Sequence, residues 1–519
     1  MATIGKNILE NLTTGMYLDS KVSYREYIQN ACDQIDKAIK EGILNADEGE
    51  VEIYIDPKKR YINIHDNATG VKAEDFQSDL GDIANSNKKR GENKGFRGIG
   101  RLCGLAYCQV LKFTTSYLGE NVASIMTCDA RKMREMLSSP IKYTIDEIWA
   151  AIVKFDKKPE SVDKHYFDVE LIDVGQAHSD LLDQTKVVDY LSFVAPVPYT
   201  NKFYLNWQVY EHAKKIGYVI DEYKILVNGE QLFKNYTTKL KEESGSNIKN
   251  YDEISKLEFH DFKDENGKLV AWMWVGLSRF EKQIPKINEM RGIRLRSANI
   301  QLGDDDTLQK RNLFREARSN YYFVGEVFAV DAGLIPNSQR DYFNENECRV
   351  KFETLLKRYF HETLYKIYYS ANGIKNAIKA QKEYVDKVES FNTKSASGGF
   401  ISEDERDKMK HDIEESRKKA EKAKKQLDKY ETVDEDSPIA EVQKSIKRQY
   451  NADEVEEQTT AVEVVSTPAK SKDSYLAASF SKLTKAERKL VSKIMTIISD
   501  IAPKEIAEQI IDKITKDLK

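Results

Sequence analysis

The period of the apolar positions changes along the chain and predicts several kinds of element. Near the N-terminus, Ile28, Ala31 and Ile35 recur at helical spacing, which predicts a helix that packs against a sheet. Residues 51–55 and 61–65 alternate apolar and polar positions on either side of a Pro-Lys-Lys-Arg turn. That alternation predicts a β-hairpin.

Further strand-like runs recur in the second part of the chain. They occupy residues 223–227, 269–275, 292–299 and 322–330. We therefore expect a first mixed domain over residues 1–200 and a second, α/β domain over residues 201–372.

The chain beyond residue 373 has the patterns of helices. Its apolar positions alternate spacings of four and three, as heptad seams do, and a Ser-Ala-Ser-Gly-Gly turn divides them. We expect a helical hairpin or coiled coil over residues 373–432. The seam positions are Ile374, Ile378, Gln381, Val385 and Val388 before the turn, and Met409, Ile413, Ser416, Ala420, Ala423, Leu427 and Tyr430 after it.

The C-terminal end divides into a linker and a helical pair. Residues 433–474 are acidic, aperiodic and rich in Thr, Val and Ser, which is typical of a flexible linker. Within residues 475–519, Thr484 and Glu487 fit a capping box that precedes two amphipathic helices. Two short helices cannot bury their apolar stripes alone, so we expect them to pair with a second copy of the chain or with a partner protein.

The predicted first helix also carries a polar face. Glu26, Asn30 and Asp33 are spaced by four and three residues and therefore align on one side of the helix. A carboxylate one turn from a carboxamide is consistent with a general base beside a metal ligand. A solvated helix face would have the same pattern, so the interpretation depends on the rest of the chain.

Two further segments support a nucleotide site. Asp66 and Gly70 follow the hairpin, where an aspartate can accept a hydrogen bond from an exocyclic amine and a glycine lets a flat base approach. For this segment alone, an ordinary Asx turn is the simpler interpretation. Gly95, Gly98 and Gly100 precede an apolar run and can expose backbone N–H groups to phosphates. Neither a complete dinucleotide fingerprint nor a Walker A loop accompanies them.

Composition limits the function classes. The 519 residues carry a net charge of −4, which gives no general attraction to nucleic acid or to an anionic membrane. The five cysteines form no C-x-x-C pair, so neither a zinc site nor a disulfide framework is expected. There is no signal-peptide pattern and no apolar run of membrane-spanning length, so we expect a cytoplasmic protein.

In their order along the chain, the polar signals resemble the three motifs of the GHKL ATPases, which include gyrase, histidine kinases, MutL and the ninety-kilodalton heat-shock chaperones. The family's E-x-x-x-N-A-x-D is matched by Glu26, Asn30, Ala31 and Asp33. Its D-x-G-x-G is matched by Asp66 and Gly70, and its G-x-x-G-x-G by Gly95, Gly98 and Gly100.

Within this superfamily the chain is most similar to the ninety-kilodalton chaperones. The run LGDIANS at residues 80–86 resembles the start of their ATP lid, and residues 322–343 resemble part of their middle domain. The similarity is dense over the first 110 residues or so and sparse from there to about residue 345. It implies an α+β two-layer sandwich (the Bergerat ATP-binding fold), an α/β middle domain and an all-α C-terminal region with coiled-coil segments.

The resemblance also implies a site for ATP and Mg²⁺. Glu26 would be the general base, and Asn30 would bind Mg²⁺, a cation that prefers oxygen ligands. Asp66 would bind the adenine amine, residues 78–94 would form a mobile lid, and Arg340 would reach the γ-phosphate from the second domain. The other nucleotide-binding residues implied are Asp33, Gly70, Asn85, Ser86, Gly95, Phe96, Arg97, Gly98, Ile99 and Gly100.

The chain departs from the family pattern at three points. Ala68 replaces the middle glycine of the second motif. His165 and Tyr166 stand where the family has Gly-Thr, which leaves one adenine-side hydroxyl unassigned. An inserted glutamine precedes Arg340, so other cations compete for its role. These rivals are Arg318, Arg315 and Lys310.

We therefore expect a Mg²⁺-dependent ATPase that is slow because domain closure completes its site. It would act as a dimeric, chaperone-like clamp on a protein client or partner. The alternative is a nucleic-acid-associated clamp like MutL or the MORC proteins, including one in a bacterial defence system, because basic segments occur at residues 408–425 and 444–448. A module that holds ATP without cycling is a third interpretation.

Overall fold

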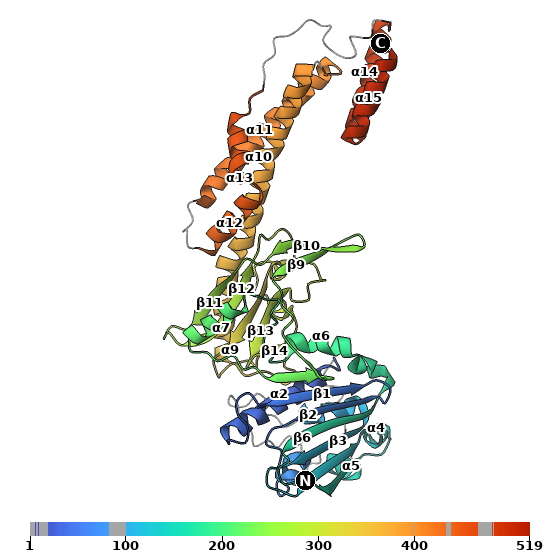
Figure 1. The fold of residues 1–519 in the computed structure, drawn as a ribbon, viewed down its shortest axis with the longest axis vertical. Coiled ribbons are helices and arrows are strands. Elements are labelled where there is room, and N and C mark those ends of the chain that lie inside the picture. The colour runs from blue at the N-terminus through green and yellow to red at the C-terminus, as the bar shows by residue number, and fades with distance from the viewer. Residues whose placement is uncertain are drawn as a thin grey trace. The chain divides into compact units, whose positions relative to one another are not determined.

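The computed structural model divides the chain into two compact units. It describes residues 19–82, 100–397, 399–431, 437–464 and 482–518, together with residues 6, 9 and 480. The first unit comprises Met1–Ser278 and Lys282–Glu362, and the second comprises Arg279–Glu281 and Thr363–Lys519. The fold of each unit is shown in Figure 1.

The first unit begins with an eight-stranded sheet in the order β5-β4-β3-β6-β2-β1-β7-β8. Neighbouring strands are antiparallel except β1 and β7, which are parallel. The predicted hairpin is confirmed, because β1 and β2 pair through the Pro-Lys-Lys-Arg turn. The strands are β1 (Glu50–Asp56), β2 (Tyr61–Asp66), β3 (Cys108–Ser116), β4 (Val122–Asp129), β5 (Val153–Pro159), β6 (Tyr166–Val174), β7 (Lys224–Val227) and β8 (Glu230–Gln231).

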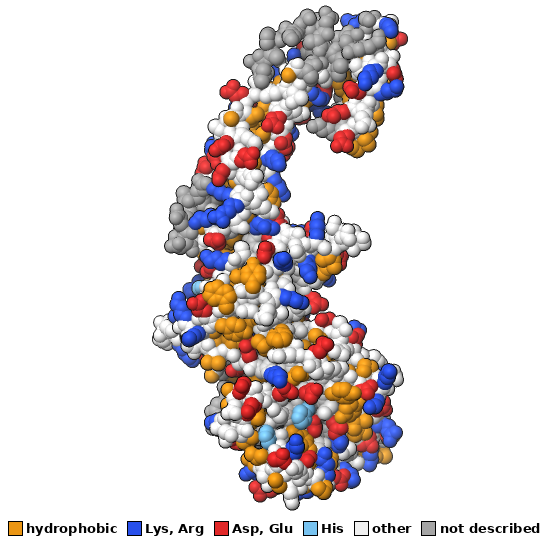
Figure 2. Space-filling view, in the orientation of Figure 1, with side chains coloured by type: hydrophobic (Ala, Val, Ile, Leu, Met, Phe, Trp, Pro, Cys, Tyr) orange, Lys and Arg blue, Asp and Glu red, His pale blue; other side chains and the backbone are white. Residues whose placement is uncertain are grey.

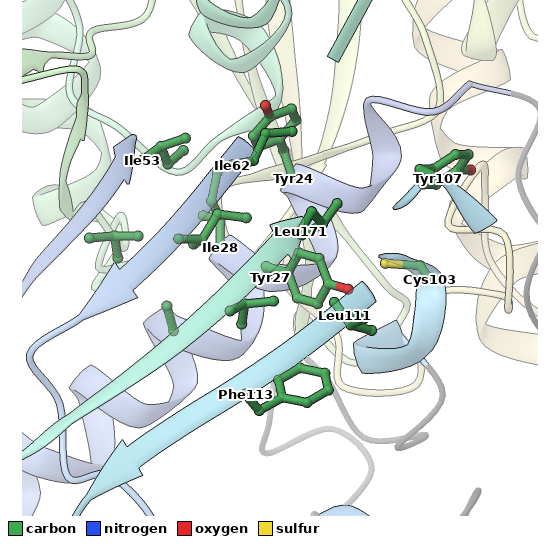
Figure 3. Close-up of a cluster of buried hydrophobic side chains, with 14 of the residues drawn as sticks. Tyr24, Tyr27, Ile28, Ile53, Ile62, Cys103, Tyr107, Leu111, Phe113 and Leu171 are labelled. Atoms are coloured by element: carbon green, nitrogen blue, oxygen red, sulfur yellow. The ribbon is translucent and has the colours of Figure 1, made fainter. Parts of the chain in front are cut away.

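Helix α2 (Val22–Lys40) packs its apolar side against this sheet, as predicted. Tyr24, Tyr27 and Ile28 lie over strand residues such as Ile62 and Leu171, and all are at most 3% exposed (Figure 3). The other helical segments of this part are α3 (Phe76–Gly81), η1 (Gly100–Ala106), α4 (Ala130–Ser138), α5 (Ile145–Ile152), η2 (Gln176–Leu182) and α6 (Gln184–Val194).

The first sheet takes strands from beyond residue 200, where we expected the first domain to end. Strand β7 pairs in parallel with β1, from Glu50 opposite Lys224 to Ile53 opposite Val227. This pairing covers an edge of β1 that would otherwise expose unpaired backbone groups. The boundary at residue 200 therefore has to be moved beyond β8.

A second sheet follows in the same unit, in the order β11-β12-β15-β13-β14. Strands β12, β13 and β15 coincide with the remaining predicted runs, whereas β11 and β14 were not predicted. The core of this sheet includes the fully buried Trp272 and Trp274. The strands are β11 (Lys256–Lys263), β12 (Leu269–Leu277), β13 (Gly292–Ser297), β14 (Ile300–Leu302) and β15 (Val324–Ala329). A separate ribbon pairs β9 (Lys239–Ser244) with β10 (Asn247–Glu253). The helical segments here are α7 (Asn206–Lys215), α8 (Thr307–Lys310), η3 (Ala317–Tyr322), α9 (Glu347–Tyr359) and η4 (Phe360–Leu364).

The regular secondary structure described in the second unit consists of helices alone. Helices α10 (Tyr365–Ser397) and α11 (Glu403–Glu431) form the expected hairpin, and its apolar cluster includes Val388, Phe391 and Ile413. Helices α14 (Lys485–Ile501) and α15 (Lys504–Leu518) follow, and the capping box of Thr484 is present. Among the described helices, none combines the length and the apolar composition needed to cross a bilayer.

The expected linker is partly helical. Residues 438–461 form α12 (Pro438–Gln449) and α13 (Ala452–Ala461) instead of an aperiodic segment. Buried apolar side chains, among them Val442, Ile446 and Val455, explain the difference. They are too sparse to give a clear period in an acidic sequence, yet they suffice for short helices that pack against α10.

Candidate functional site

Helix α2 presents the polar face that the spacing of Glu26, Asn30 and Asp33 predicted. Glu26 and Asp33 are each only 5% exposed, and Asn30 is half-buried. A solvated helix face would leave these carboxylates in water. Burying a carboxylate is costly unless the fold supplies partners for it, so the surroundings of Glu26 are informative.

Two arginines contact the same oxygen of Glu26. The Nε atom of Arg340 lies 3.1 Å from Oε1 of Glu26, and Nη2 of Arg25 lies 3.4 Å from the same atom. The three side chains are 6–11% exposed, so water screens this cluster little. The cluster joins the first helix to a loop that lies more than three hundred residues later in the chain.

The loop that carries Arg340 is a tight turn. The backbone N–H of Arg340 donates to the carbonyl of Asn337 (3.2 Å), and the N–H of Asn337 donates to the carbonyl of Tyr342 (2.9 Å). Arg340 has φ +54°, a left-handed conformation that is unfavourable for an arginine. Such strain persists only where the surroundings impose it, and it is concentrated at functional sites.

Arg25 is the side chain that fastens this loop to α2. Its Nη2 donates to the carbonyl of Gln339 (3.2 Å) and its Nη1 approaches the carbonyl of Arg340 (3.5 Å). Sequence reasoning missed Arg25. Its position next to Glu26 was the available signal, but neighbours in a helix point in different directions and its target lies more than three hundred residues later in the chain.

Gly100, the last glycine of the third motif, lies against Glu26. A Cβ atom at this position would be 2.5 Å from Oε2 of Glu26, so any larger residue here would have to displace the Glu26 carboxylate. The neighbouring Tyr27 accepts the N–H of Gly104 (2.9 Å) and donates to the carbonyl of Arg101 (3.0 Å). Burial raises the pKa of Tyr27 well above its ordinary value, which keeps this donor protonated.

Asp66 ends β2 in a buried position on the side of the sheet that α2 covers. Its Oδ1 accepts the N–H of Ala68 (3.1 Å), so the Asx turn expected of this segment is present. The hydroxyl of Thr69 donates to Oε1 of Gln34 on α2 (3.0 Å). The structure therefore brings the second motif alongside the helix of the first.

Gly70 is required by the packing of the sheet. It has φ +67°, and a Cβ there would be 1.9 Å from the carbonyl oxygen of Ser116 on β3. This contact is a sufficient reason for glycine at this position.

Of the two residues that replace the family's Gly-Thr, His165 contacts the second motif and Tyr166 bonds elsewhere. Nδ1 of His165 is 2.8 Å from the carbonyl of Ala68, and the hydroxyl of Tyr166 donates to Glu160 (2.9 Å). The hydroxyl of Thr115 also lies beside Gly70; it donates to the carbonyl of Tyr166 (2.7 Å) and accepts the N–H of Val71 (3.0 Å). Sequence reasoning missed Thr115, which is one of many threonines in strands.

The donor atoms of this site fit Mg²⁺ better than a softer metal. Asn30 supplies a carboxamide oxygen beside two carboxylates of the same helix face. Within the described ranges, no cluster of three or more His, Cys, Asp or Glu residues is arranged to hold a metal ion. Magnesium commonly takes one or two protein oxygens and completes its shell with water and substrate phosphates.

The rival cations have other partners or positions. Lys310 pairs with Asp306 (2.8 Å), and the exposed Arg318 pairs with Glu316 (2.7 Å). Arg315 is exposed. The other predicted nucleotide residues lie outside the described residues. They are Asn85, Ser86, Gly95, Phe96, Arg97, Gly98 and Ile99.

Comparison with known proteins matches the same part of the chain. Residues 26–158 match the family described as Histidine kinase-, DNA gyrase B-, and HSP90-like ATPase. Chaperone protein HtpG of Orientia tsutsugamushi is 35% identical over 95 residues, which cover 17% of this chain and 15% of that protein. HtpG of Chlorobium phaeobacteroides is 34% identical over 87 residues, covering 16% and 14%. HtpG of Halalkalibacterium halodurans is 28% identical over 131 residues, covering 22% and 21%.

These matches span less than a quarter of each curated relative. The family match begins at Glu26 on α2 and includes strands β1 to β4 of the first sheet. The resemblance predicted from three short motifs is thereby confirmed: residues 26–158 match the GHKL ATPase family, and the chain is similar over part of its length to the HtpG chaperones.

Proposed function

We propose that this protein is a slow, Mg²⁺-dependent ATPase that works as a chaperone-like clamp on a protein client or partner. Glu26 activates the attacking water, and Arg340 stabilises the charge on the transferred phosphoryl group. Asn30 holds Mg²⁺, which neutralises phosphate charge when it is bound. Asp66 recognises the adenine amine.

One observation carries this proposal: the 3.1 Å contact between Arg340 and Glu26. An arginine from the second domain reaches the carboxylate that the first motif assigns as the base. In this arrangement the two charges neutralise each other, so the γ-phosphate of ATP would compete with Glu26 for Arg340. When Arg340 moves from Glu26 to the γ-phosphate, the Glu26 carboxylate becomes available as a base. Each turnover requires this rearrangement, so we expect a low rate.

The decisive experiment combines hydrolysis with binding. Glu26→Ala in the full chain should lower phosphate release from ATP by about 100-fold or more, because a general base contributes 10²–10⁴ in rate. Binding of a fluorescent ATP analogue should be retained. Glu41→Ala, at the exposed end of the same helix, serves as the matched control. Wild-type turnover by Glu26→Ala would remove Glu26 from this role.

The clamp also needs a second copy of the chain, and we place its contact on α14 and α15. Leu490, Ile494, Ile497 and Ile501 are 44–80% exposed and follow the 4-3-4 spacing of a heptad seam. Hydrophobic side chains are visible on this helical pair in Figure 2. A seam with this period is complementary to another helix of the same kind.

The dimer is tested by the mass of the full chain in solution. Light scattering should give twice the chain mass for the wild type and the monomer mass for Ile497→Asp. Ile248→Asp, at a residue 62% exposed on β10, controls for the loss of an exposed isoleucine. A monomeric wild type, or a dimeric Ile497→Asp, would contradict this placement.

The face shown in Figure 2 favours a protein partner over nucleic acid. Lysine and arginine side chains are interspersed there with aspartate and glutamate. A nucleic-acid clamp needs a continuous basic surface, and its binding weakens steeply with salt. A salt-sensitive mobility shift on DNA would reverse this preference.

A further inference from the structure

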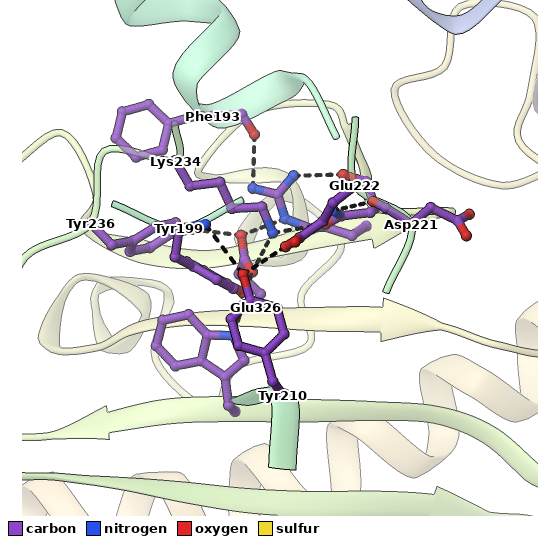
Figure 4. A network of polar contacts seen from close by, with 11 residues as sticks. Phe193, Tyr199, Tyr210, Asp221, Glu222, Lys234, Tyr236 and Glu326 are labelled. Atoms are coloured by element: carbon purple, nitrogen blue, oxygen red, sulfur yellow. Dashed lines mark hydrogen bonds and ion pairs between the residues drawn. The ribbon is translucent and has the colours of Figure 1, made fainter. Parts of the chain in front are cut away.

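A second buried carboxylate, Glu326 on β15, lies at the centre of a polar cluster in the second sheet (Figure 4). Its side chain is 0% exposed. Arg296 and Tyr236 donate to one oxygen, Tyr236 at 2.9 Å, and Lys234 and Tyr199 donate to the other, Lys234 at 3.2 Å. We call this cluster the Glu326 hub; its members are Tyr199, Lys234, Tyr236, Arg296, Asn299 and Glu326.

The hub joins the β13–β14 hairpin to the end of the ATPase domain. Nη2 of Arg296, on β13, donates to the carbonyl of Phe193 at the end of α6 (2.8 Å). Nδ2 of Asn299, in the hairpin turn, donates to the carbonyl of Asp221 (2.6 Å), and its Oδ1 accepts from Nζ of Lys234 (2.7 Å). Both backbone acceptors belong to segments that flank the first sheet.

The other end of this hairpin holds the Arg340 loop. Strand β14 runs from Ile300 to Leu302, and the next residue, Gly303, donates its N–H to the carbonyl of Arg340 (3.0 Å). Gly303 has φ +62°, and a Cβ there would be 2.7 Å from the carbonyl oxygen of Asp341. Only a short rigid strand therefore separates the hub from the backbone that carries the active-site arginine.

We infer that the Glu326 hub is a positioning device for Arg340. It fixes the β13–β14 hairpin to the end of the ATPase domain, and the hairpin fixes the strained Arg340 backbone so that its guanidinium reaches Glu26. The inference rests on the proposed function of Arg340. Buried charges add little net stability, so a cluster of this size is better explained by the single geometry that it imposes.

Asn299→Gly tests this inference with little risk to the fold. Asn299 has φ +59°, which glycine adopts freely, so the change removes two side-chain hydrogen bonds and leaves the backbone unstrained. The matched control is Asn312→Gly, a left-handed asparagine (φ +54°) exposed at the surface and outside the hub. Lys234→Met is a second variant, which removes the hydrogen bond between Lys234 and Asn299 by changing the donor.

We expect Asn299→Gly to lower kcat for ATP hydrolysis by about tenfold while KM stays constant, because small misplacements of a catalytic group are costly. Asn312→Gly should behave as wild type. In an Arg340→Ala background, Asn299→Gly should have no further effect, since both changes remove the same contribution. An equal loss in both backgrounds, or wild-type kcat, would overturn the inference.

A second readout separates this inference from the proposed function. Hydrogen exchange of residues 337–342 in the full chain without ATP should be faster in Asn299→Gly than in Asn312→Gly. Unchanged exchange would overturn the hub's role. Faster exchange in a chain that does not hydrolyse ATP would support the hub and contradict only the proposed function.

Discussion

Glu26 and Glu326 are both buried carboxylates held by two cationic side chains, yet their surroundings differ. Glu326 has zero exposure and accepts from hydroxyls and from both cations on its two oxygens. At Glu26, Arg25 and Arg340 contact the same carboxylate oxygen, and the other oxygen faces Gly100. A fully bonded carboxylate fixes structure, whereas one that faces a glycine and a strained arginine has room for chemistry.

The pKa values sharpen this contrast. Burial alone would raise the pKa of Glu326, but Arg296 and Lys234 outweigh burial and hold it at about 2. Burial and the Arg296 charge lower the pKa of Lys234 to about 7. Glu326 therefore stays ionised across the physiological range, and Lys234 is the hub member that can change its charge.

The largest predicted effect concerns the arginine of the first cluster. Arg340→Ala should lower ATP turnover on the order of 10³-fold, as expected for an arginine that stabilises a transferred phosphoryl group. Arg318→Ala, which loses only an exposed pair with Glu316, should keep wild-type turnover. Steady-state phosphate release measures the turnover of both variants. Equal turnover by Arg340→Ala and Arg318→Ala would show that the Glu26 cluster has no catalytic role.

The next prediction concerns stability, where Glu326 should matter more than Glu26. Glu326→Gln leaves two buried cations without their shared anion, so it should lower the free energy of unfolding by about 3–5 kcal/mol. Glu26→Gln should cost less, about 1–2 kcal/mol, because Arg25 keeps the carbonyls of Gln339 and Arg340 as acceptors. Urea denaturation followed by circular dichroism gives both values. A larger loss for Glu26→Gln would mean that its cluster is structural.

A third prediction concerns the glycine next to the second motif. Gly70→Ala should cost at least about 2 kcal/mol more than Gly119→Ala, since overpacking costs 1–3 kcal/mol or more. Both glycines have positive φ, but a Cβ at Gly119 has nothing within 4 Å. The difference isolates the contact with Ser116, and thermal unfolding measures it. Equal losses would show that only backbone strain matters at Gly70.

The smallest effect is a pH dependence that Lys234 introduces. Between pH 7 and its ordinary value of 10.5, the unfolded chain carries the Lys234 proton and the folded chain largely does not. The unfolded state then binds more protons, so this group makes stability rise with pH. Relative to Lys234→Met, the wild type should gain roughly 2 kcal/mol from pH 7 to pH 9. A parallel pH profile for the two proteins would show that Lys234 keeps its proton.

The sequence predicted the elements well because their apolar periods are local. The hairpin of β1 and β2, the strands β12, β13 and β15 and the α10–α11 hairpin appear where the period placed them, whereas β11 and β14 were not predicted. The helices of residues 438–461 were missed because a few buried residues give no clear period. The first motif predicted which helix face carries Glu26, since spacing within one helix is fixed by geometry.

The partners of Glu26 could not be predicted from spacing. Arg340 reaches Glu26 only because the second sheet, Gly303 and Arg25 hold its loop in place, and each of these depends on long-range packing. The Glu326 hub was missed for the same reason. Its members are scattered between residues 199 and 326 and form no motif.

The parallel pairing of β7 with β1 has a practical consequence for dissecting this protein. A fragment that ends at residue 200 would remove β7 and β8 and leave the outer backbone groups of β1 open to pairing with another molecule. Such a fragment should self-associate, whereas one that continues past Leu232 keeps the sheet capped. Measurements on an isolated nucleotide domain therefore depend on where the chain is cut.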